Sequence, residues 1–322
     1  MEYTKPKHAN RWMYRIEPDG LTVRELSFET NRGGAPVTVV QLTDLHFNYV
    51  NQQDFEEANP ALMSTYENRK WLANGASVST AIKCLEYAKT ADKIVITGDI
   101  LDFISHGTVE LVKKHIFEPY GKKVMASLGN HETSRQVEGT VKDPTTMESR
   151  MKILENNWCN DVYYSSEVLG DKVMLIQMDN ASQFDAYRRS FWERQVEPLS
   201  RDLALAREKG YAVLLFFHCN ISTGDPADRQ VRASMVYKRG EYKNYYDYDC
   251  AKSDSEGASG IVYNMIVNNA DVIKACICGH QHGDYYTEIQ AKTPSGVDTL
   301  IPQYCMMASV YGKGHVLKIT VR

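Results

Sequence analysis

The sequence predicts an α/β protein, and three observations support this prediction. Short apolar runs rich in β-branched residues recur along the 322 residues, with candidate helices between several of them. Each run is nearly continuous rather than alternating, which is typical of strands buried on both faces of a sheet. Clusters of Asp, Asn and His directly follow five of the runs. We therefore expect sheets that carry polar side chains at the ends of their strands.

The apolar runs define the predicted strands. A further run, "GHVLKITV", contains His315 and predicts a final core strand, and the extension formed by residues 1–36 is expected to contain another strand. The six main strands are predicted at Val37–Leu42, Lys93–Thr97, Lys123–Leu128, Val173–Met178, Ala212–Phe217 and Val272–Cys278.

Three helices are predicted between these strands. Ser77 is a candidate N-cap for the first, because apolar residues follow it at helical spacing. A second is expected from Pro198 to Gly210, and a third from about Ser259 to Asn269. The insertion from Asn48 to Gly75 is a candidate for another wall of the site. It begins with polar residues and little periodicity, so it is predicted to be a loop, and we assign it no chemistry.

Composition and charge limit the possible functions. The chain is 43% hydrophobic and 24% charged, with a net charge of −4 and a pI near 6.2, which is ordinary for a globular protein and argues against a nucleic-acid partner. No run reaches the ~20 apolar residues of a membrane span, and the N-terminus has no apolar signal region. We therefore expect one domain over residues 1–322, located in the cytoplasm; the oligomeric state stays open.

The seven cysteines are an odd number and are scattered along the chain, unlike the disulfide framework of a secreted protein. Cys276 and Cys278 alternate within an apolar run, which indicates buried strand positions rather than a metal site.

The polar clusters follow the strands in a fixed order. "TDLH" follows the first strand, "GDILD" the second, "GNHE" the third, "HCN" the fifth and "GHQH" the sixth. Each cluster alone is weak and could be an ordinary turn. Ligand sites in open α/β sheets lie beyond the carboxyl ends of the strands, so five clusters at five such ends predict one shared site.

Histidine and aspartate pairs at i and i+2 indicate a metal centre. Side chains at this spacing in an extended segment lie on the same side, so Asp44 and His46 can reach one ion together. His280 and His282 have the same spacing, and two ions about 3.5–4 Å apart would let each histidine bind a different ion.

The remaining clusters complete a set of oxygen and nitrogen ligands. A carboxylate is needed to bridge the two ions, and Asp99 at the Gly-Asp turn is the best candidate. Asn130 adds a neutral oxygen, and His218 adds another imidazole. Such a donor set without thiolate suits two divalent or mixed-valence ions of Mn, Fe or Zn.

Together these residues resemble the five ordered motifs of the calcineurin-like metallophosphoesterases, from about Val37 to Asp284. The resemblance implies a four-layer α/β/β/α sandwich of two mixed sheets flanked by helices. The matching residues are Asp44-x-His46, Gly98-Asp99-x-x-Asp102, Gly129-Asn130-His131-Glu132, His218 and Gly279-His280-x-His282.

The resemblance also implies a role for each residue. His131 would donate a proton to the leaving oxygen, with Asp102 orienting its ring. A water bridging the two ions would lose a proton and attack phosphorus in line. One ion would be held by Asp44, His46, Asp99 and His282, and the other by Asp99, Asn130, His218 and His280.

At several positions this chain differs from two related phosphatase subfamilies, which argues against membership of either. Purple acid phosphatases would have tyrosine in place of Asp102 and no histidine in place of His46. Protein serine/threonine phosphatases would have arginines where this chain has Phe103 and Leu128. Glu132 replaces the commoner aspartate, and we expect it to support the ligands from behind.

The sequence therefore predicts a phosphoester hydrolase for a small-molecule substrate, with diesters slightly ahead of monoesters. A nuclease, or a non-catalytic scaffold on the same fold, is the alternative.

Several neighbouring segments keep two interpretations. Residues 219–258 are an insertion whose tyrosine-rich part, Val236–Cys250, is either an ordered surface loop or a lid over the substrate. His106 is either a surface residue or part of the pocket. Asp179 and Asn180 either cap a turn or support the site.

Overall fold

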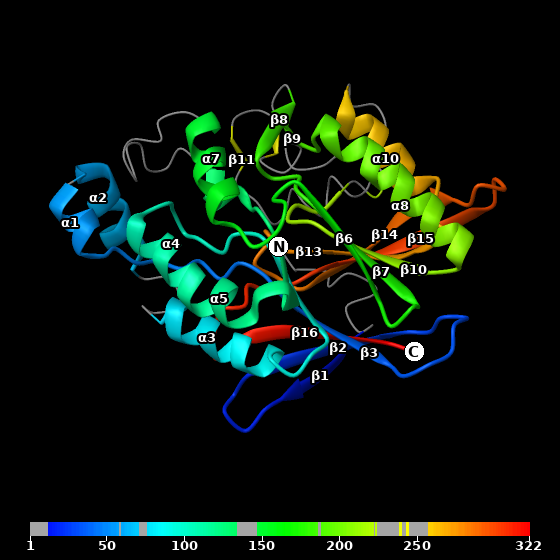
Figure 1. The fold of residues 1–322 in the computed structure, drawn as a ribbon, viewed down its shortest axis with the longest axis horizontal. Helices are drawn as coiled ribbons and strands as arrows, with labels where there is room; N and C mark the ends of the chain where they lie inside the picture. Colours follow the sequence, from blue (N-terminus) through cyan, green and yellow to red (C-terminus); the bar gives the residue numbers. More distant parts are fainter. Residues whose placement is uncertain are drawn as a thin grey trace.

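The computed structural model describes residues 12–57, 59–70, 76–133, 147–185, 188–221, 223, 238–239, 243–244 and 257–322. Two six-stranded sheets form its centre, and helices cover their outer faces (Figure 1). The predicted insertion at 219–258, including the tyrosine-rich Val236–Cys250, lies mostly outside the described residues. Within the described ranges, no helix combines the length and apolar character that crossing a bilayer requires.

The first sheet mixes parallel and antiparallel pairs. Strands β3, β4 and β5 are parallel, so their carboxyl ends lie at one edge, while β16 runs antiparallel to β3. Its strands in spatial order are β1 (Met13–Ile16), β2 (Thr22–Phe28), β16 (His315–Val321), β3 (Val37–Leu42), β4 (Lys93–Thr97) and β5 (Val124–Ser127).

The second sheet is also mixed. Its central strands β15, β13, β10 and β7 are parallel, and an antiparallel strand flanks them on each side. Its order is β14 (Tyr285–Lys292), β15 (Asp298–Cys305), β13 (Ile273–Cys278), β10 (Ala212–Phe216), β7 (Val173–Met178) and β6 (Tyr164–Leu169). Two short pairs stand apart, β8 (Gln183–Asp185) with β9 (Arg188–Ser190), and β11 (Lys238–Arg239) with β12 (Lys243–Asn244).

Helices complete the outer layers. The first sheet packs against α3 (Ser77–Ala88), α4 (His106–Val112) and α7 (Met147–Asn157), and the second against α8 (Val196–Lys209) and α10 (Ala258–Val267). The shorter helices are α1 (Gln52–Glu57), α2 (Pro60–Arg69), α5 (Glu118–Tyr120), α6 (Asn130–Thr133), the π-helix η2 (Lys113–Phe117) and the 3₁₀ turns η3 (Gly121–Lys123) and η4 (Glu193–Gln195).

The central strands β4 and β7 are buried along their whole length because both of their faces are covered. Val39 and Val95 lie in the core between the sheets, whereas their neighbours Val40 and Ile94 face the outer helices. The four-layer α/β/β/α arrangement is therefore confirmed. Cys276 and Cys278 are buried in β13, as predicted, and this burial raises the pKa of both thiols.

The six predicted strands are found within two residues of their expected ends. The predicted cap at Ser77 is wrong, because Ala76 is the N-cap and Ser77 is already helical. The helix expected from Pro198 begins two residues earlier, at Val196, and ends as predicted at Gly210, which adopts a left-handed φ of 72°.

The loop predicted after Asn48 is wrong, because α1 and α2 occupy most of this segment. Asn59 caps α2 by accepting hydrogen bonds from the backbone of Ala61 and Leu62, and Pro60 is its first residue. Leu62 packs with Val50 and Phe103, so this weakly amphipathic helix is held by tertiary contacts.

Candidate metal centre

Loops from both sheets meet at one place. They follow the carboxyl ends of β3, β4 and β5 in the first sheet and of β10 and β13 in the second. The ligand atoms of Asp44, His46, Asp99 and His282, which come from three of these loops, all lie within 4.8 Å of one another. We call these four residues the first group.

The atoms of the first group are arranged as a cation would require. His46 Nε2 and His282 Nε2 are 3.0 Å apart, and Asp44 Oδ1 lies 3.1 Å from His282 Nε2 and 3.8 Å from His46 Nε2. Among the described residues, the buried Asp44 Oδ1 has no hydrogen-bond partner. Two imidazole nitrogens and a buried carboxylate oxygen that lie this close together fit a divalent metal ion.

A second group adjoins the first and consists of Asp99, Asn130, His218 and His280. His218 Nε2 lies 3.1 Å from Asn130 Oδ1 and 3.3 Å from Asp99 Oδ2. His280 and Cys219 place ligand atoms within 4.8 Å of His218. Asp99 thus contacts residues of both groups, as a bridging carboxylate would. The Cys219 thiol is a neighbour of this group that sequence analysis did not include.

The charges of the two groups are coupled. Burial opposes ionisation of Asp99, but the imidazoles of His218 and His131 outweigh it and hold its pKa well below the ordinary value. Burial alone would lower the pKa of His218, yet the Asp99 charge raises it to about 10. Burial also disfavours the Asp44 carboxylate, but His282 brings its pKa down to about 2.

The backbone of the ligand loops corrects one part of the sequence argument. Asp44 and His46 were expected to share a side because the segment is extended, but their φ values are 52° and 43°. Asp99, His280 and His282 also have a left-handed φ, so five of the seven predicted ligands adopt this conformation. Such a conformation costs about 1–3 kcal/mol at a non-glycine residue. Its concentration here indicates a functional site.

Two motif glycines allow the loops to approach closely. A Cβ on Gly279 would lie 1.8 Å from Thr43 Oγ1 and 2.6 Å from Asp44 Oδ2. A Cβ on Gly129 would lie 2.2 Å from Asp99 Oδ1. All three distances are shorter than van der Waals contact, so a larger residue at either position would push a predicted ligand out of place.

Glu132 supports the ligand loops from behind, as expected. Its buried carboxylate accepts hydrogen bonds from the backbone nitrogens of Asp99 (3.1 Å), Leu101 (2.8 Å) and Gly129 (2.7 Å). Burial and the Asp99 charge raise the pKa of Glu132 to about 7. One side chain thus ties the loop after β4 to the loop after β5.

His131 lies beside the first group, and its Nδ1 faces Asp102. Nδ1 donates to the Asp102 backbone oxygen at 2.9 Å and is 3.3 Å from the Asp102 carboxylate. The ring Nε2 is 4.0 Å from Asp99 Oδ2. Burial would lower the pKa of His131, but the charges of Asp99 and Asp102 raise it to about 9. Both carboxylates therefore favour the protonated form of the ring.

The structure adds residues that sequence reasoning missed. Arg69 and Asn48 both donate to the Asp102 carboxylate, although the sequence led us to assign no chemistry to their segment. Tyr311 places its hydroxyl 2.8 Å from His282 Nδ1. The cap-and-proline pair Asn59-Pro60 could have revealed the helix that carries Arg69.

A buried arginine from the N-terminal extension holds the loop after β13. Arg24 in β2 pairs with Asp284 and lies 3.1 Å from His315 Nδ1. Asp284 also accepts a hydrogen bond from the Met307 backbone nitrogen at 3.0 Å. Asp284 follows His282 by two residues, so the extension supports the loop that carries two predicted ligands.

The residues after the fourth predicted strand divide between the two interpretations. Asp179 caps a turn by accepting hydrogen bonds from the backbone of Ala181 and Ser182. Asn180 instead pairs with the backbone nitrogen and oxygen of Cys219, the residue after His218, and so supports the site. His106 lies at the start of α4, with Nε2 2.9 Å from Glu57 Oε1, and it belongs to neither ligand group.

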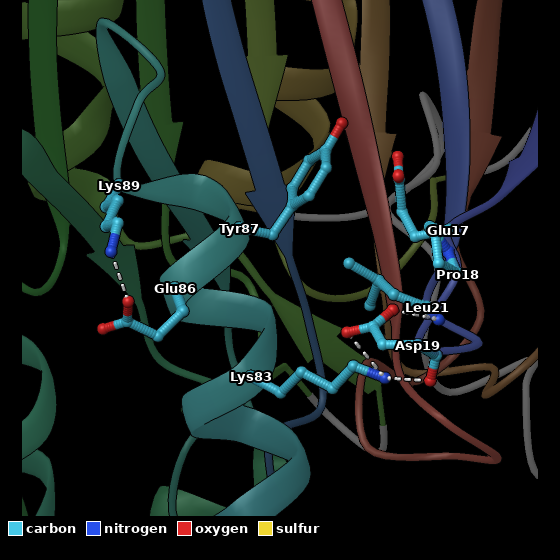
Figure 2. A pocket seen from close by; sticks show the side chains of 8 residues that line it. All are labelled: Glu17, Pro18, Asp19, Leu21, Lys83, Glu86, Tyr87 and Lys89. Atoms are coloured by element: carbon cyan, nitrogen blue, oxygen red, sulfur yellow. Dashed lines mark hydrogen bonds and ion pairs between the residues drawn. The ribbon is translucent and has the colours of Figure 1, made fainter.

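A surface hollow of about 410 Å³ lies between α3 and the turn after β1 (Figure 2). Its charged side chains pair with one another, Lys83 with Asp19 at 3.2 Å and Lys89 with Glu86 at 2.6 Å. No predicted ligand is among the residues that line it. We assign this hollow no chemical role.

Comparisons with known proteins identify the family of this chain. Residues 37–284 match the calcineurin-like phosphoesterase family, whereas a comparison with curated proteins gave no match. Similar solved structures include a dimetal phosphatase from Danio rerio (13% identity, 84% of this chain and 87% of that chain, TM-score 0.48). Another is PhoD, which is 7% identical over 91% of this chain and 60% of that chain, with a TM-score of 0.42. The calcineurin-like phosphoesterase YfkN from Bacillus subtilis is 14% identical over 85% of this chain and 81% of that chain, with a TM-score of 0.29. Because the family match spans most of the chain, the protein belongs to the calcineurin-like phosphoesterases, hydrolases that act on phosphoester bonds.

Proposed function

We propose that this protein hydrolyses small-molecule phosphoesters with two metal ions held by the two groups. The observation that carries the proposal is the convergence of Asp44, His46 and His282 beside Asp99, which also contacts the second group. The proposed ligands are Asp44, His46, Asp99 and His282 for one ion, and Asp99, Asn130, His218 and His280 for the other.

The donor set favours Mn, Fe or Zn. Bound ions supply Lewis acidity at the phosphoryl oxygens and a water of lowered pKa. The protein fixes their positions through three loops on one sheet and two on the other, and Glu132 locks two of these loops together.

His131 is proposed as the general acid. Its raised pKa and its position beside Asp99 suit proton donation to a leaving oxygen. Because Nδ1 is held by the Asp102 backbone oxygen, Nε2 is the atom that would give up the proton.

Diesters are proposed as the better substrates, ahead of monoesters. The support is the Asp-x-His form of the first motif, which is similar to that of many phosphodiesterases. The net charge of −4 argues against a long nucleic-acid substrate.

A substrate panel tests the proposal. Purified protein is loaded with Mn²⁺, Zn²⁺ or Fe²⁺ and assayed on aryl monoesters, aryl diesters, cyclic nucleotides and nucleotide-sugar pyrophosphates. We expect metal-dependent hydrolysis that a chelator abolishes, with a diester ahead of its matched monoester. Protein that carries two ions and hydrolyses none of these substrates would overturn the proposal.

A further inference from the structure

Helix α2 ends with a guanidinium directed at the candidate site. Arg69, its last residue, donates from Nε to Asp102 Oδ2 at 2.6 Å and places Nη2 2.5 Å from Asp102 Oδ1. The Asp102 side chain is fully buried, and that of Arg69 is 21% exposed. A planar guanidinium that contacts both carboxylate oxygens fixes the direction of the carboxylate as well as its charge.

The Asp102 carboxylate faces two histidines with different proposed tasks. Its Oδ1 lies 3.2 Å from Nδ1 of His46, a proposed metal ligand. The same oxygen lies 3.3 Å from Nδ1 of His131, the proposed general acid. Asn48 donates to the other oxygen at 2.9 Å. A rotation of this one carboxylate would therefore disturb both rings.

The helix that carries Arg69 is fixed in place close to Asp102. Leu62 of α2 packs against Phe103, the residue directly after Asp102, and Asn59 caps the start of the helix. The segment that bears the arginine and the segment that bears the aspartate thus share a small apolar core. Burial disfavours the Asp102 carboxylate, but His131, His46 and Arg69 hold its pKa well below the ordinary value.

We propose that Arg69 is a positioning residue, through which the segment 48–70 aligns His131 for proton transfer and His46 for metal binding by clamping Asp102. This inference rests on the proposed hydrolase function. It gives a role to the segment 48–70, to which the sequence assigned no chemistry. It also accounts for the contact between the partly exposed Arg69 and the buried Asp102 carboxylate.

Three variants separate the clamp from a general effect of charge. Arg69→Gln removes the cation and the fork. Arg69→Lys keeps a cation but cannot contact both oxygens in one plane. Lys70→Gln is the matched control, because it removes a positive charge from the next residue, which pairs with Glu67 at the surface.

The kinetic readout is the dependence of kcat on the leaving group. With Arg69→Gln we expect a fall in kcat of about 10–100-fold, as for other residues that orient ligands from behind. KM should change little, and two ions should remain bound when the metal is in excess. The loss should be greater for alkyl than for aryl esters, because a misaligned His131 matters most where the leaving oxygen needs a proton. The kcat of Arg69→Lys should lie between those of Arg69→Gln and the wild type, and the kcat of Lys70→Gln should equal that of the wild type.

A second readout needs no catalysis. In metal-free protein, the ring N–H resonances of His46 and His131 should shift in Arg69→Gln and stay in place in Lys70→Gln. Unshifted resonances together with a wild-type leaving-group dependence would overturn the inference. If Arg69→Gln does not fold, Arg69→Lys decides by the same two readouts. If the wild type hydrolyses nothing, the proposed function fails, while the resonances still decide whether Arg69 holds the rings.

Discussion

The two ends of the candidate metal centre differ in what lies behind their ligands. At the first end, His46 faces the Asp102 carboxylate, and His282 contacts the Tyr311 hydroxyl. At the second end, His218 donates from Nδ1 to the backbone oxygen of Thr97 at 2.7 Å. Among these three histidines, side-chain groups support the two at the first end, whereas a backbone oxygen supports the one at the second end.

The residues proposed as ligands also differ in charge between the two ends. The first group contains the carboxylates of Asp44 and Asp99, whereas the second shares Asp99 and adds the neutral amide of Asn130. More negative charge at the first end should bind a divalent cation more tightly. The difference teaches that the two ends are not equivalent, although the sequence motifs present them as a pair.

The largest effect on metal binding is expected from a substitution of Asp99, which both ends of the centre share. Asp99→Asn keeps the shape of the side chain but removes its charge from both groups. We expect bound metal, measured by elemental analysis after desalting, to fall from two ions per chain to nearly none. Two tightly bound ions in this variant would refute the bridging assignment.

Substitutions at each end should separate the two ions. Asp44→Asn is expected to lose the first ion and keep the second, whereas His218→Asn should do the reverse. Titration of Mn²⁺ into each metal-free variant would measure the remaining site, and the site left in His218→Asn should be the tighter one. Equal affinities in the two variants would contradict the proposed asymmetry.

A substitution at His131 should slow turnover without changing the binding of either ion. His131→Ala is expected to keep two ions and to slow kcat by roughly 10²–10⁴-fold. The loss should shrink for esters with acidic leaving groups, which need less protonation. Equal losses across a series of leaving groups would show that His131 is not the proton donor.

Much of this arrangement could be predicted because its signals are local. Asp44, Asp99 and His218 each lie within two residues of the end of a buried strand, so the strand places them. The left-handed φ of Asp44 could not be predicted, since it depends on hydrogen bonds from the Asp44 and His46 backbone nitrogens to the loop after β4.

The supporting residues are harder to find from sequence. Arg69 reaches Asp102 across 33 positions, Tyr311 reaches His282 across 29, and Arg24 approaches Asp284 across 260. No fixed spacing links such pairs, because the fold rather than the local chain brings them together. Arg69 was further hidden because α2 has little amphipathic pattern and is held by Leu62 against Phe103.

The smallest effect is expected at Tyr311, which supports the first end alone. Tyr311→Phe removes the hydroxyl from His282 Nδ1 but keeps the ring that packs edge-on against the imidazole at 5.3 Å. Loss of such a partner lowers metal affinity by about tenfold at the lower end of the usual range. Mn²⁺ titration should therefore show a weaker first site and an unchanged second site. If both sites weakened together, the two ends would share their support, and the asymmetry would lie in the ligands and not in the residues behind them.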